Sequence, residues 1–276
     1  MMFFTNEDID RLITEDVPYF DLTKELLEID SPGKIEFFTR KDAVVTCNEI
    51  VEKLAKKLDL EVIFKEKDGK FVTSGSKIFE AKGENVLILW KVAQNIYEYG
   101  MSVSTYVYEM KKKAQIHNPH LEILTTRKII PYTKKIALKA VMDGGGWPHR
   151  VTTTETILVF DNYINLYGGW DKFFKNFSKF RHKAAEKKWV VECKDVDMAK
   201  KFAEIEVDVI QLDKASPQTV QEVVELCKDK NIKVLAAGGI NINNIEEYAK
   251  TGVDGIVTTA PYFAKGADIK VVIDSL

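Results

Sequence analysis

Short apolar segments recur at a nearly constant interval along the second half of the chain, and this rhythm limits the possible folds more than any other feature. The last four, residues 189–193, 208–212, 233–237 and 255–259, have centres 19, 25 and 22 residues apart. Segments this apolar, separated by single stretches with helical spacing, are typical of strands in a parallel sheet. Two earlier segments, 121–126 and 156–160, bring the number to six, which favours closure toward a barrel. An open, doubly wound sheet is the alternative.

One of the stretches between the strands, residues 165–187, combines aromatic and basic side chains. Such interleaving can bind single-stranded nucleic acid. Trp170, Phe173 and Phe177, however, recur at intervals of three and four, which places the aromatic side chains on one face of a helix and most basic ones on the other. We therefore interpret the stretch as an amphipathic helix that packs on the barrel, and we expect no nucleic-acid partner.

The part of the chain before Asn118-Pro119 has a mixed rhythm. A helix and an irregular arm, interrupted by Pro18, occupy about the first 30 residues. Strand-like alternation follows at residues 35–47, 61–64 and 71–81, and helical spacing marks residues 46–58 and 86–110. We therefore predict two domains: a mixed α/β domain with a long helix over residues 1–115, and an α/β barrel over residues 116–276.

Charge and cysteine usage restrict the partners and the location. The 276 residues carry 40 basic and 42 acidic side chains, for a net charge of −2, so any anion site must be local. Cys47, Cys193 and Cys227 lack CxxC spacing and are odd in number, which fits a reducing cytoplasm and argues against a disulfide frame or a zinc cluster. No apolar run reaches membrane-spanning length, and the N-terminus lacks the basic region of a signal peptide. We expect a cytoplasmic protein without a membrane partner.

Cationic side chains are concentrated between residues 125 and 162. Arg127, Lys128, His149 and Arg150 fall within 24 positions, and Gly144-Gly145-Gly146 lies among them. An arginine fork suits carboxylate or phosphate oxygens, a lysine supplies a point charge, and glycines let the main chain approach a ligand closely. The segment therefore predicts an anion-binding site. A basic surface loop with a flexible glycine hinge is the plain alternative.

The ends of the predicted strands carry polar residues, and barrels place their chemistry at these ends. Glu192 and Asp213 each end a strand, and such acids suit ribose hydroxyls, a phosphate-bound Mg²⁺ or a developing cation. Gly238-Gly239 and Thr258-Thr259 end the last two strands, where backbone N–H groups and hydroxyls would bind a phosphate. Helix caps for the acids and a simple turn for the glycines are the alternatives.

Several motifs occur in a fixed order along nearly the whole chain. They are Asp21-Leu22-Thr23, Lys91-Val92-Ala93-Gln94-Asn95, Thr126-Arg127-Lys128, Gly144-Gly145-Gly146 with His149-Arg150, Asp161-Asn162, Glu192, Leu212-Asp213 and Gly238-Gly239-Ile240. In this order and spacing they resemble the quinolinate phosphoribosyltransferase family, also called nicotinate-nucleotide pyrophosphorylases. Within that family the chain most resembles the ModD group, which is associated with molybdenum transport.

The resemblance implies a type II phosphoribosyltransferase fold: an N-terminal α/β sandwich-like domain and an incomplete, seven-stranded TIM-like α/β barrel. It also implies a homodimer, or a higher assembly, in which the N-terminal domain of one subunit covers the barrel mouth of another. The implied reaction transfers phosphoribose from phosphoribosyl pyrophosphate to a small carboxylated acceptor, with Mg²⁺. In the family the acceptor is a pyridine dicarboxylate, and pyrophosphate and CO₂ are released.

The resemblance assigns the acceptor side of the site by position. Arg127, His149 and Arg150 would bind the carboxylate of the acceptor, and Lys128 would lie beside the pyrophosphate or the acceptor. Lys91 would reach in from the partner subunit.

The donor side follows in the same way. Glu192 and Asp213 would lie by the ribose and by a Mg²⁺ ion that the substrate carries, so that the protein itself would not be the main metal ligand. The resemblance places Gly238-Gly239 at the 5-phosphate, where the hydroxyls of Thr258-Thr259 at the neighbouring strand end would also bind.

The departures from the family pattern lie mainly around the acceptor. Phe160 occupies the place of a lysine that contacts quinolinate, Pro148 that of an asparagine, and Lys91 that of an arginine. At the phosphate side, Ala237 replaces a serine and Thr259 a glycine. A carboxylate left unpaired in a closed site costs more than a lost hydrogen bond. We therefore expect an acceptor with fewer negative charges than quinolinate.

Two other classes of function stay open. The first is a non-catalytic barrel that binds phosphate or molybdate and has an accessory role in molybdenum transport, since both ions are tetrahedral and a phosphate site could hold either. The second is a sugar-phosphate aldolase, which would need a lysine at a strand end to form a Schiff base. Lys128 and Lys214 are the candidates for that lysine.

Overall fold

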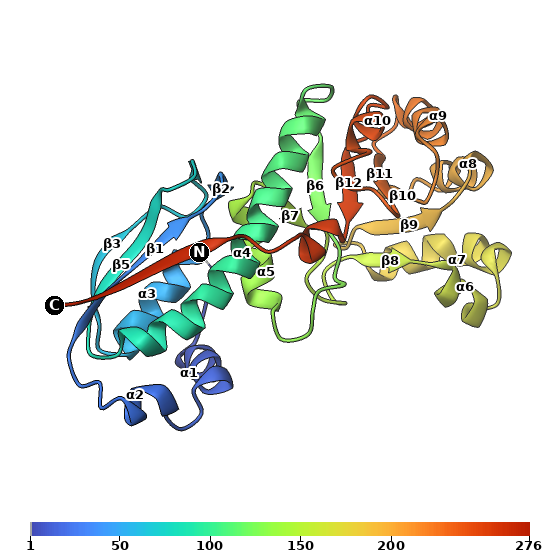
Figure 1. The fold of residues 1–276 in the computed structure, drawn as a ribbon. Coiled ribbons are helices and arrows are strands. Elements are labelled where there is room, and N and C mark those ends of the chain that lie inside the picture. Colours follow the sequence, from blue (N-terminus) through green and yellow to red (C-terminus); the bar gives the residue numbers. More distant parts are fainter. Residues whose placement is uncertain (1) are drawn as a thin grey trace. The chain divides into compact units, whose positions relative to one another are not determined.

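The computed structural model describes residues 2–276, and the chain divides into two compact units (Figure 1). Unit 1 comprises Met1–Tyr108, Ile129–Gly145 and Pro261–Leu276, and unit 2 comprises Glu109–Lys128 and Gly146–Ala260. This division differs from the single boundary predicted at residue 115. The chain returns to unit 1 because a helix after residue 128 and the last strand pack there, so neither unit is one continuous stretch.

A four-stranded antiparallel sheet forms one layer of unit 1. Its strands are, in spatial order, β13 (Ile269–Ser275), β1 (Gly33–Thr39), β5 (Lys77–Gly83) and β3 (Glu61–Lys65), while β2 (Ala43–Val44) and β4 (Phe71–Val72) pair separately. Burial alternates along β1, where Ile35 and Phe37 are fully buried, as in a sheet with one face on the core. β13 pairs with the whole of β1, with Ile269 opposite Thr39. These last residues were predicted to belong to the barrel, so that part of the domain prediction is corrected.

Helices cover this sheet. They are α1 (Asn6–Asp16), α2 (Leu22–Leu26), α3 (Asn48–Lys57), α5 (Lys134–Asp143) and the first part of α4 (Val86–Gln115), which begins in unit 1 and ends in unit 2. Leu54 of α3 and Leu89 and Tyr97 of α4 are fully buried in the core of unit 1. The predicted helical spacing at residues 46–58 and 86–110 is thus confirmed. No helix in the described part of the chain, α4 included, is long and apolar enough to cross a membrane.

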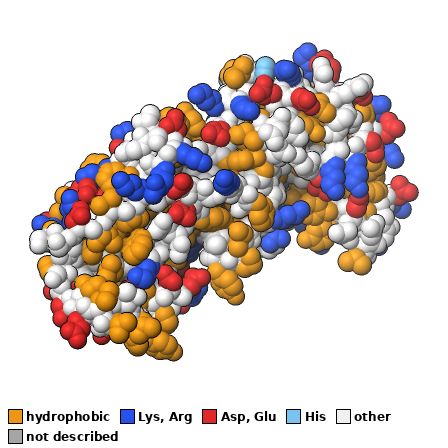
Figure 2. Space-filling view, viewed as in Figure 1, with side chains coloured by type: hydrophobic (Ala, Val, Ile, Leu, Met, Phe, Trp, Pro, Cys, Tyr) orange, Lys and Arg blue, Asp and Glu red, His pale blue; other side chains and the backbone are white. Residues whose placement is uncertain are grey.

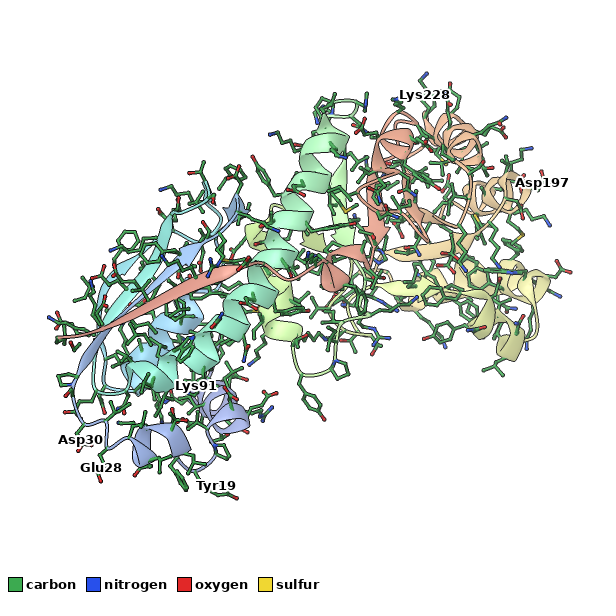
Figure 3. The ribbon with its side chains drawn as sticks, in the orientation of Figure 1. Tyr19, Glu28, Asp30, Lys91, Asp197 and Lys228 are labelled. Carbon is green, nitrogen blue, oxygen red and sulfur yellow. The ribbon has the colours of Figure 1, made fainter. Side chains whose placement is uncertain are left out.

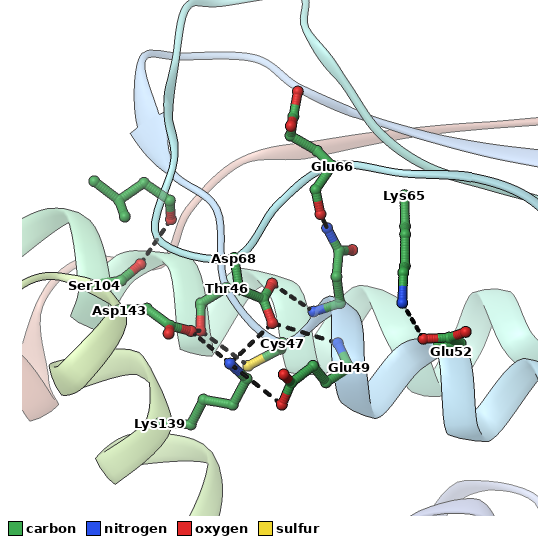
Figure 4. Close-up of polar contacts among 12 residues, drawn as sticks. Thr46, Cys47, Glu49, Glu52, Lys65, Glu66, Asp68, Ser104, Lys139 and Asp143 are labelled. Carbon is green, nitrogen blue, oxygen red and sulfur yellow. Dashed lines mark hydrogen bonds and ion pairs between the residues drawn. The ribbon is translucent and has the colours of Figure 1, made fainter. Parts of the chain in front are cut away.

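A buried ion cluster ties α5 to unit 1 (Figure 4). Lys139 Nζ lies 2.9 Å from carboxylate oxygens of both Asp68 and Asp143, and 3.8 Å from one of Glu49. Thr46 Oγ1 also donates a hydrogen bond of 2.5 Å to Asp143. Burial by itself would lower the pKa of Lys139, but the bonds to Asp68 and Asp143 outweigh it and raise that pKa. The ammonium therefore stays charged, as a buried cation with carboxylate partners can.

Seven parallel strands form the sheet of unit 2. They are β6 (Glu122–Thr125), β7 (Trp147–Pro148), β8 (Ile157–Val159), β9 (Trp189–Cys193), β10 (Val209–Asp213), β11 (Lys233–Ala237) and β12 (Gly255–Thr258). Their spatial order is β7-β6-β12-β11-β10-β9-β8. The first strand of the unit pairs with the last, which is the neighbour relation of a barrel and not of a doubly wound sheet. Because β7 and β8 are the two ends of the order, the barrel is incomplete, as predicted.

Helices α6 (Asp161–Tyr167), α7 (Trp170–Lys183), α8 (Val196–Glu204), α9 (Pro217–Cys227) and α10 (Ile245–Ala249) lie around this sheet (Figure 1). The aromatic face of α7 is buried, with the Phe177 ring 5.2 Å from that of Trp189 in β9. This confirms the prediction of an amphipathic helix on the barrel. Inside the sheet, Leu158, Val190 and Val257 belong to an apolar cluster that forms the floor below the strand ends.

Candidate active site

The carboxyl ends of the strands in unit 2 surround a cavity of about 580 Å³. All the residues that line it belong to unit 2. Every predicted site residue except Lys91 is among them: Arg127, Lys128, His149, Arg150, Phe160, Glu192, Asp213, Gly238, Gly239, Thr258 and Thr259. The strand ends therefore meet at one common cavity, and the roles of its residues are still predictions.

Short β7 completes the cationic side of the cavity. It pairs with β6, and His149 N donates to Thr125 O over 2.9 Å, so His149-Arg150 follow β7 at the level where Arg127-Lys128 follow β6. Among residues 2–276, no carboxylate lies within ion-pair distance of Arg127, Lys128 or Arg150. Burial, together with the charge of Arg150, lowers the pKa of His149 to about 4. A neutral imidazole thus lies among unpaired cations, an arrangement suited to an anionic ligand.

Two carboxylates lie on adjacent strands at the other side. Glu192 and Asp213 are at the ends of β9 and β10, which pair in parallel. Burial raises the pKa of Glu192, and the negative charge of Asp213 raises it further. Gln211 Nε2 donates a hydrogen bond of 2.8 Å to Glu192 Oε2. The two acids therefore present negative charge to the same cavity that the cations line.

The loop after β11 begins with two consecutive glycines that both have a left-handed backbone. Gly238 and Gly239 have φ values of +86° and +80°, which only glycine adopts readily. A Cβ at Gly238 would lie 2.6 Å from Asp213 Oδ1, so this position also lacks room for a side chain. Thr258 Oγ1 donates to Ile240 O over 2.6 Å and is buried, and it therefore holds the loop. Thr259 Oγ1 lies 3.0 Å from Thr126 Oγ1 at the cavity wall.

The structure adds lining residues that the sequence-based reasoning missed or used otherwise. Gln211 and Asn241 were not predicted to line the site, and Lys214 was predicted only as a candidate for a Schiff base. Lys214 has a left-handed backbone with φ of 57°, and its N–H donates to Ala237 O over 2.8 Å. A polar residue inside an apolar strand was the available signal for Gln211. For Lys214 the signal was its place directly after Asp213.

Lys91 does not line the cavity. It belongs to unit 1, where its Nζ lies 2.6 Å from Asp21 Oδ2 and 5.1 Å from the centre of the Trp90 ring (Figure 3). Asp21 at the same time caps α2 by accepting bonds from two backbone N–H groups. Two motifs that are 70 residues apart in sequence therefore meet within unit 1.

The triple glycine has a different place from the one predicted. Gly144, Gly145 and Gly146 are not among the residues that line the cavity. A Cβ at Gly144 would lie 2.4 Å from Ser104 O, so this glycine allows the end of α5 to approach α4 closely. Gly145, with φ of +85°, follows Gly144, which is the C-cap of α5. The prediction that these glycines approach a ligand is corrected: helix packing explains Gly144.

Two models of protein families match the chain, one for each part of it. The N-terminal domain of quinolinate phosphoribosyl transferase matches residues 21–100, and the C-terminal domain matches residues 103–272. ModD of Pasteurella multocida, provisionally named a pyrophosphorylase, is 36% identical over 99% of both chains. A protein of Methanothermobacter thermautotrophicus, provisionally named a carboxylating nicotinate-nucleotide pyrophosphorylase, is 29% identical over 90% of this chain and 91% of its own.

Solved structures share the fold. The nicotinate-nucleotide pyrophosphorylase of Francisella tularensis has a TM-score of 0.89 and 24% identity, over 99% of this chain and 98% of its own. That of Ehrlichia chaffeensis has the same TM-score with 21% identity, over 99% and 100%. The two family models together cover most of residues 21–272, the ModD relative is similar along nearly its whole length, and the solved structures share the fold. The chain therefore belongs to the quinolinate phosphoribosyltransferase family, a family of pentosyltransferases.

Proposed function

We propose that the chain is a phosphoribosyltransferase whose donor is phosphoribosyl pyrophosphate and whose acceptor is a small carboxylated N-heterocycle. One observation carries this proposal: four cationic side chains and two carboxylates surround a single cavity of about 580 Å³ beside the loop of Gly238-Gly239. The excess of positive charge matches a donor with phosphate groups and an acceptor with a carboxylate. The two acids match a sugar on which positive charge develops.

In the proposed reaction, the bond between ribose C1 and the pyrophosphate oxygen breaks, and a bond between C1 and the ring nitrogen of the acceptor forms. Positive charge develops on the sugar, and negative charge develops on the departing pyrophosphate. Glu192 and Asp213 would stabilise the first charge, and Lys128 and Lys214 the second. Each interaction is stronger in the transition state than in the bound substrates, which is the condition for catalysis.

Glu192 and Asp213 could bind Mg²⁺ only together with a substrate that already carries the ion. No cluster of three or more His, Cys, Asp or Glu side chains within residues 2–276 could hold a metal. In proteins, Mg²⁺ is usually held by one or two carboxylates together with phosphate oxygens and water. Bound in this way, it neutralises charge on the pyrophosphate. We therefore propose that Mg²⁺ enters with the donor, near Glu192 and Asp213.

The acceptor side has one cationic wall and one apolar wall. Phe160 stacks on Tyr163, with ring centres 6.1 Å apart, and lines the cavity together with Leu158. A second carboxylate against this wall would be desolvated without a partner. The cations at Arg127 and Arg150 suit a single carboxylate. We therefore propose an aromatic acceptor with one carboxylate in place of quinolinate, which has two.

A screen of carboxylated pyridines and related heterocycles tests the reaction. Each is incubated with phosphoribosyl pyrophosphate and Mg²⁺, and pyrophosphate release is followed. A monocarboxylated ring is expected to react, and Asp213→Ala is expected to lose at least a hundredfold in rate. The variant Phe160→Lys is the matched test of acceptor charge, because it should shift the preference toward dicarboxylates.

The non-catalytic alternative predicts a different pattern. A barrel that only binds an oxyanion would release no pyrophosphate with any acceptor, and calorimetry would show molybdate or phosphate binding. Tighter binding of molybdate than of phosphate would support a role in molybdenum handling, whereas equal weak binding would leave only a generic anion site. No melting-temperature shift with millimolar phosphoribosyl pyrophosphate and Mg²⁺ would contradict the proposed donor.

We further propose that the chain works as a homodimer in which Lys91 reaches the cavity of the partner. Lys91 does not line the cavity of its own chain. Beside its ion-pair partner Asp21, large apolar side chains are exposed: Tyr19 is 90% exposed and Leu26 is 78% exposed. Apolar side chains gather in this region at the lower left of Figure 2, around α2. Clustered apolar exposure of this kind is typical of an interface.

Complementation tests the dimer. When Lys91→Ala and Asp213→Ala subunits are coexpressed, half of the dimers are mixed, and each mixed dimer has one intact site. About a quarter of the wild-type activity should therefore return, although each variant alone is inactive. Light scattering of Leu26→Glu, expected to be monomeric, checks the contact surface. A wild-type monomer in that measurement would contradict the proposal without affecting the donor assignment.

A further inference from the structure

Gln211 is a buried polar residue in an otherwise apolar barrel interior. Only 4% of it is exposed, and it lies on β10 two residues before Asp213. In the parallel register, Gln211 is opposite Glu192 on one side and Leu235 on the other. An amide in this position needs hydrogen-bond partners on both of its ends.

The amide is bonded at one end only. Its Nε2 donates a bond of 2.8 Å to Glu192 Oε2, whereas its Oε1 is fully buried without a hydrogen-bond partner. An ionised carboxylate can only accept, so the amide must turn its N–H toward Glu192 and leave its carbonyl unpaired. A buried carbonyl without a partner destabilises the free protein. A local loss of stability of this kind is typical of a functional site.

The bond also fixes the carboxylate. One oxygen of Glu192 is held by Gln211, and its other oxygen has no hydrogen-bond partner within residues 2–276. Glu192 itself lines the cavity and is only partly buried. The hydrogen bond to one oxygen restricts rotation of the carboxylate, which favours one direction for the other oxygen. A fixed acceptor is what a binding site for sugar hydroxyls requires.

We propose that Gln211 is a positioning residue, which holds one oxygen of Glu192 so that the other is presented, ionised, to the sugar of the donor. This inference rests on the proposed function of the cavity. Separately, burial and the charge of Asp213 raise the pKa of Glu192, and the N–H of Gln211 opposes both. Loss of that N–H therefore raises the pKa of Glu192 further, and the acid would take up a proton at a higher pH.

Two variants of the same size as Gln211 separate positioning from packing. Gln211→Met removes the N–H and the unpaired carbonyl together, and Gln211→Glu replaces the donor by a second acid. Val209→Ala is the matched control: it lies two residues earlier on the same face of β10 and leaves the bond in place. Three measurements are made on each full-length variant: the melting temperature without ligand, the affinity for phosphoribosyl pyrophosphate with Mg²⁺, and the titration of Glu192 by ¹³C NMR, assigned with Glu192→Gln.

Gln211→Met is expected to melt at the same temperature as the wild type or at a higher one. It should bind the donor about tenfold more weakly at pH 7. The titration of Glu192 should move to a higher pH by about one pH unit. Gln211→Glu should move it further, because the two acids repel. Val209→Ala should lower the melting temperature and leave the titration unchanged. A purely structural Gln211 would instead give a lower melting temperature and an unchanged affinity for the donor in Gln211→Met.

The readouts separate this inference from the proposed function. The NMR titration needs no ligand, so it tests the link between Gln211 and Glu192 even in a protein that does not bind phosphoribosyl pyrophosphate. Identical titration curves in the wild type and Gln211→Met would overturn the inference. A Glu192 that is still protonated at pH 7.5 in the wild type would also overturn it, because the amide would then face the other way.

Discussion

The imidazole of His149 is held neutral by its surroundings, which makes the stability of the free protein sensitive to acid. The pKa of this group is about 4 in the folded protein, against an ordinary value of 6.5. Between these two pH values, the imidazole of His149 is mostly protonated in the unfolded chain and mostly neutral in the folded protein. The stabilising effect is therefore complete above pH 6.5 and is lost as the pH falls through 4.

His149→Gln should remove this part of the pH dependence. Between pH 7 and pH 4, the variant is expected to lose less free energy of unfolding than the wild type, by up to about 3 kcal/mol. Urea denaturation at several pH values measures this difference. His120→Gln, at an exposed position, is the control and should follow the wild type. Parallel curves for His149→Gln and the wild type would contradict the assignment.

Lys214 combines a left-handed backbone with a cationic side chain at the cavity. Asparagine tolerates that backbone conformation better than lysine. Lys214→Asn should therefore leave the free energy of unfolding unchanged or raise it by up to about 1 kcal/mol, while it weakens binding of phosphoribosyl pyrophosphate about tenfold. Thermal unfolding and calorimetry measure the two effects. Lys233→Asn, which removes an equal charge at the start of β11, should leave the affinity unchanged.

Which single residues could be predicted from the sequence follows from geometry. Arg127, Glu192 and Asp213 were found because strand ends in a parallel barrel converge, so position along the chain was sufficient. Gln211 was not found, because it lies inside β10, two residues before the strand end to which the convergence of strand ends applies. The contact of Lys91 with Asp21 was missed because no local pattern relates the two segments.

At the scale of elements, the loop after β11 shows two separate reasons for a glycine: a left-handed backbone and a lack of space for a side chain. Both glycines have a left-handed backbone, but only Gly238 also lacks space for a side chain, whereas nothing lies within 4 Å of a Cβ at Gly239. Gly239→Ala should cost about 1 kcal/mol through backbone strain alone. Gly238→Ala should displace Asp213 or Lys214 as well, and it should reduce donor affinity at least tenfold more than Gly239→Ala. Equal effects in calorimetry would contradict this reading of the loop.

Helix α5 depends on its buried ammonium group. Lys139→Met leaves the carboxylates of Asp68 and Asp143 without their cation, and the loss of one partner of a buried ion cluster typically costs about 3–5 kcal/mol. Urea denaturation at pH 7 measures the cost. Lys135→Met on the same helix breaks a more exposed pair with Asp8 and should cost less than about 1 kcal/mol. A similar small cost for both variants would show that the cluster contributes little.

Helices and strands could be predicted where their hydrophobic periodicity extends over many consecutive residues. The strands β9 to β12 and helices α4 and α7 have clear periodicity, and the structure confirms them. β7 contains only Trp147–Pro148, which is too short to show any periodicity. It forms a strand because it pairs with the free edge of β6. β13 has the composition of a strand, but its partner β1 lies more than 200 residues earlier. Pairing over such a distance leaves no signal in the segment itself.

At the scale of the whole molecule, unit 1 depends on the last residues of the chain. β13 covers one edge of β1 over seven paired positions. Removal of residues 269–276 would expose this edge and part of the core around Ile35 and Phe37, so hydrogen exchange should increase throughout β1 and β5. Amides of β9 to β12 in unit 2 should stay protected. Lys270→Ala, which keeps the strand, is the control, and unchanged exchange in the truncated protein would contradict this dependence.

The pairing of β13 with β1 has a consequence for how the protein is made. Domains usually fold in the order in which the ribosome delivers them, with the N-terminal part first. Here, the residues of unit 2 have all been synthesised before Ile269 is added, whereas the sheet of unit 1 that contains β1 is complete only after residues 269–275. A nascent chain stalled before Ile269 would thus carry all the strands of unit 2 and an uncovered edge of β1. A stop codon before Ile269 would therefore remove the partner strand of β1 and leave every strand of unit 2 in the chain.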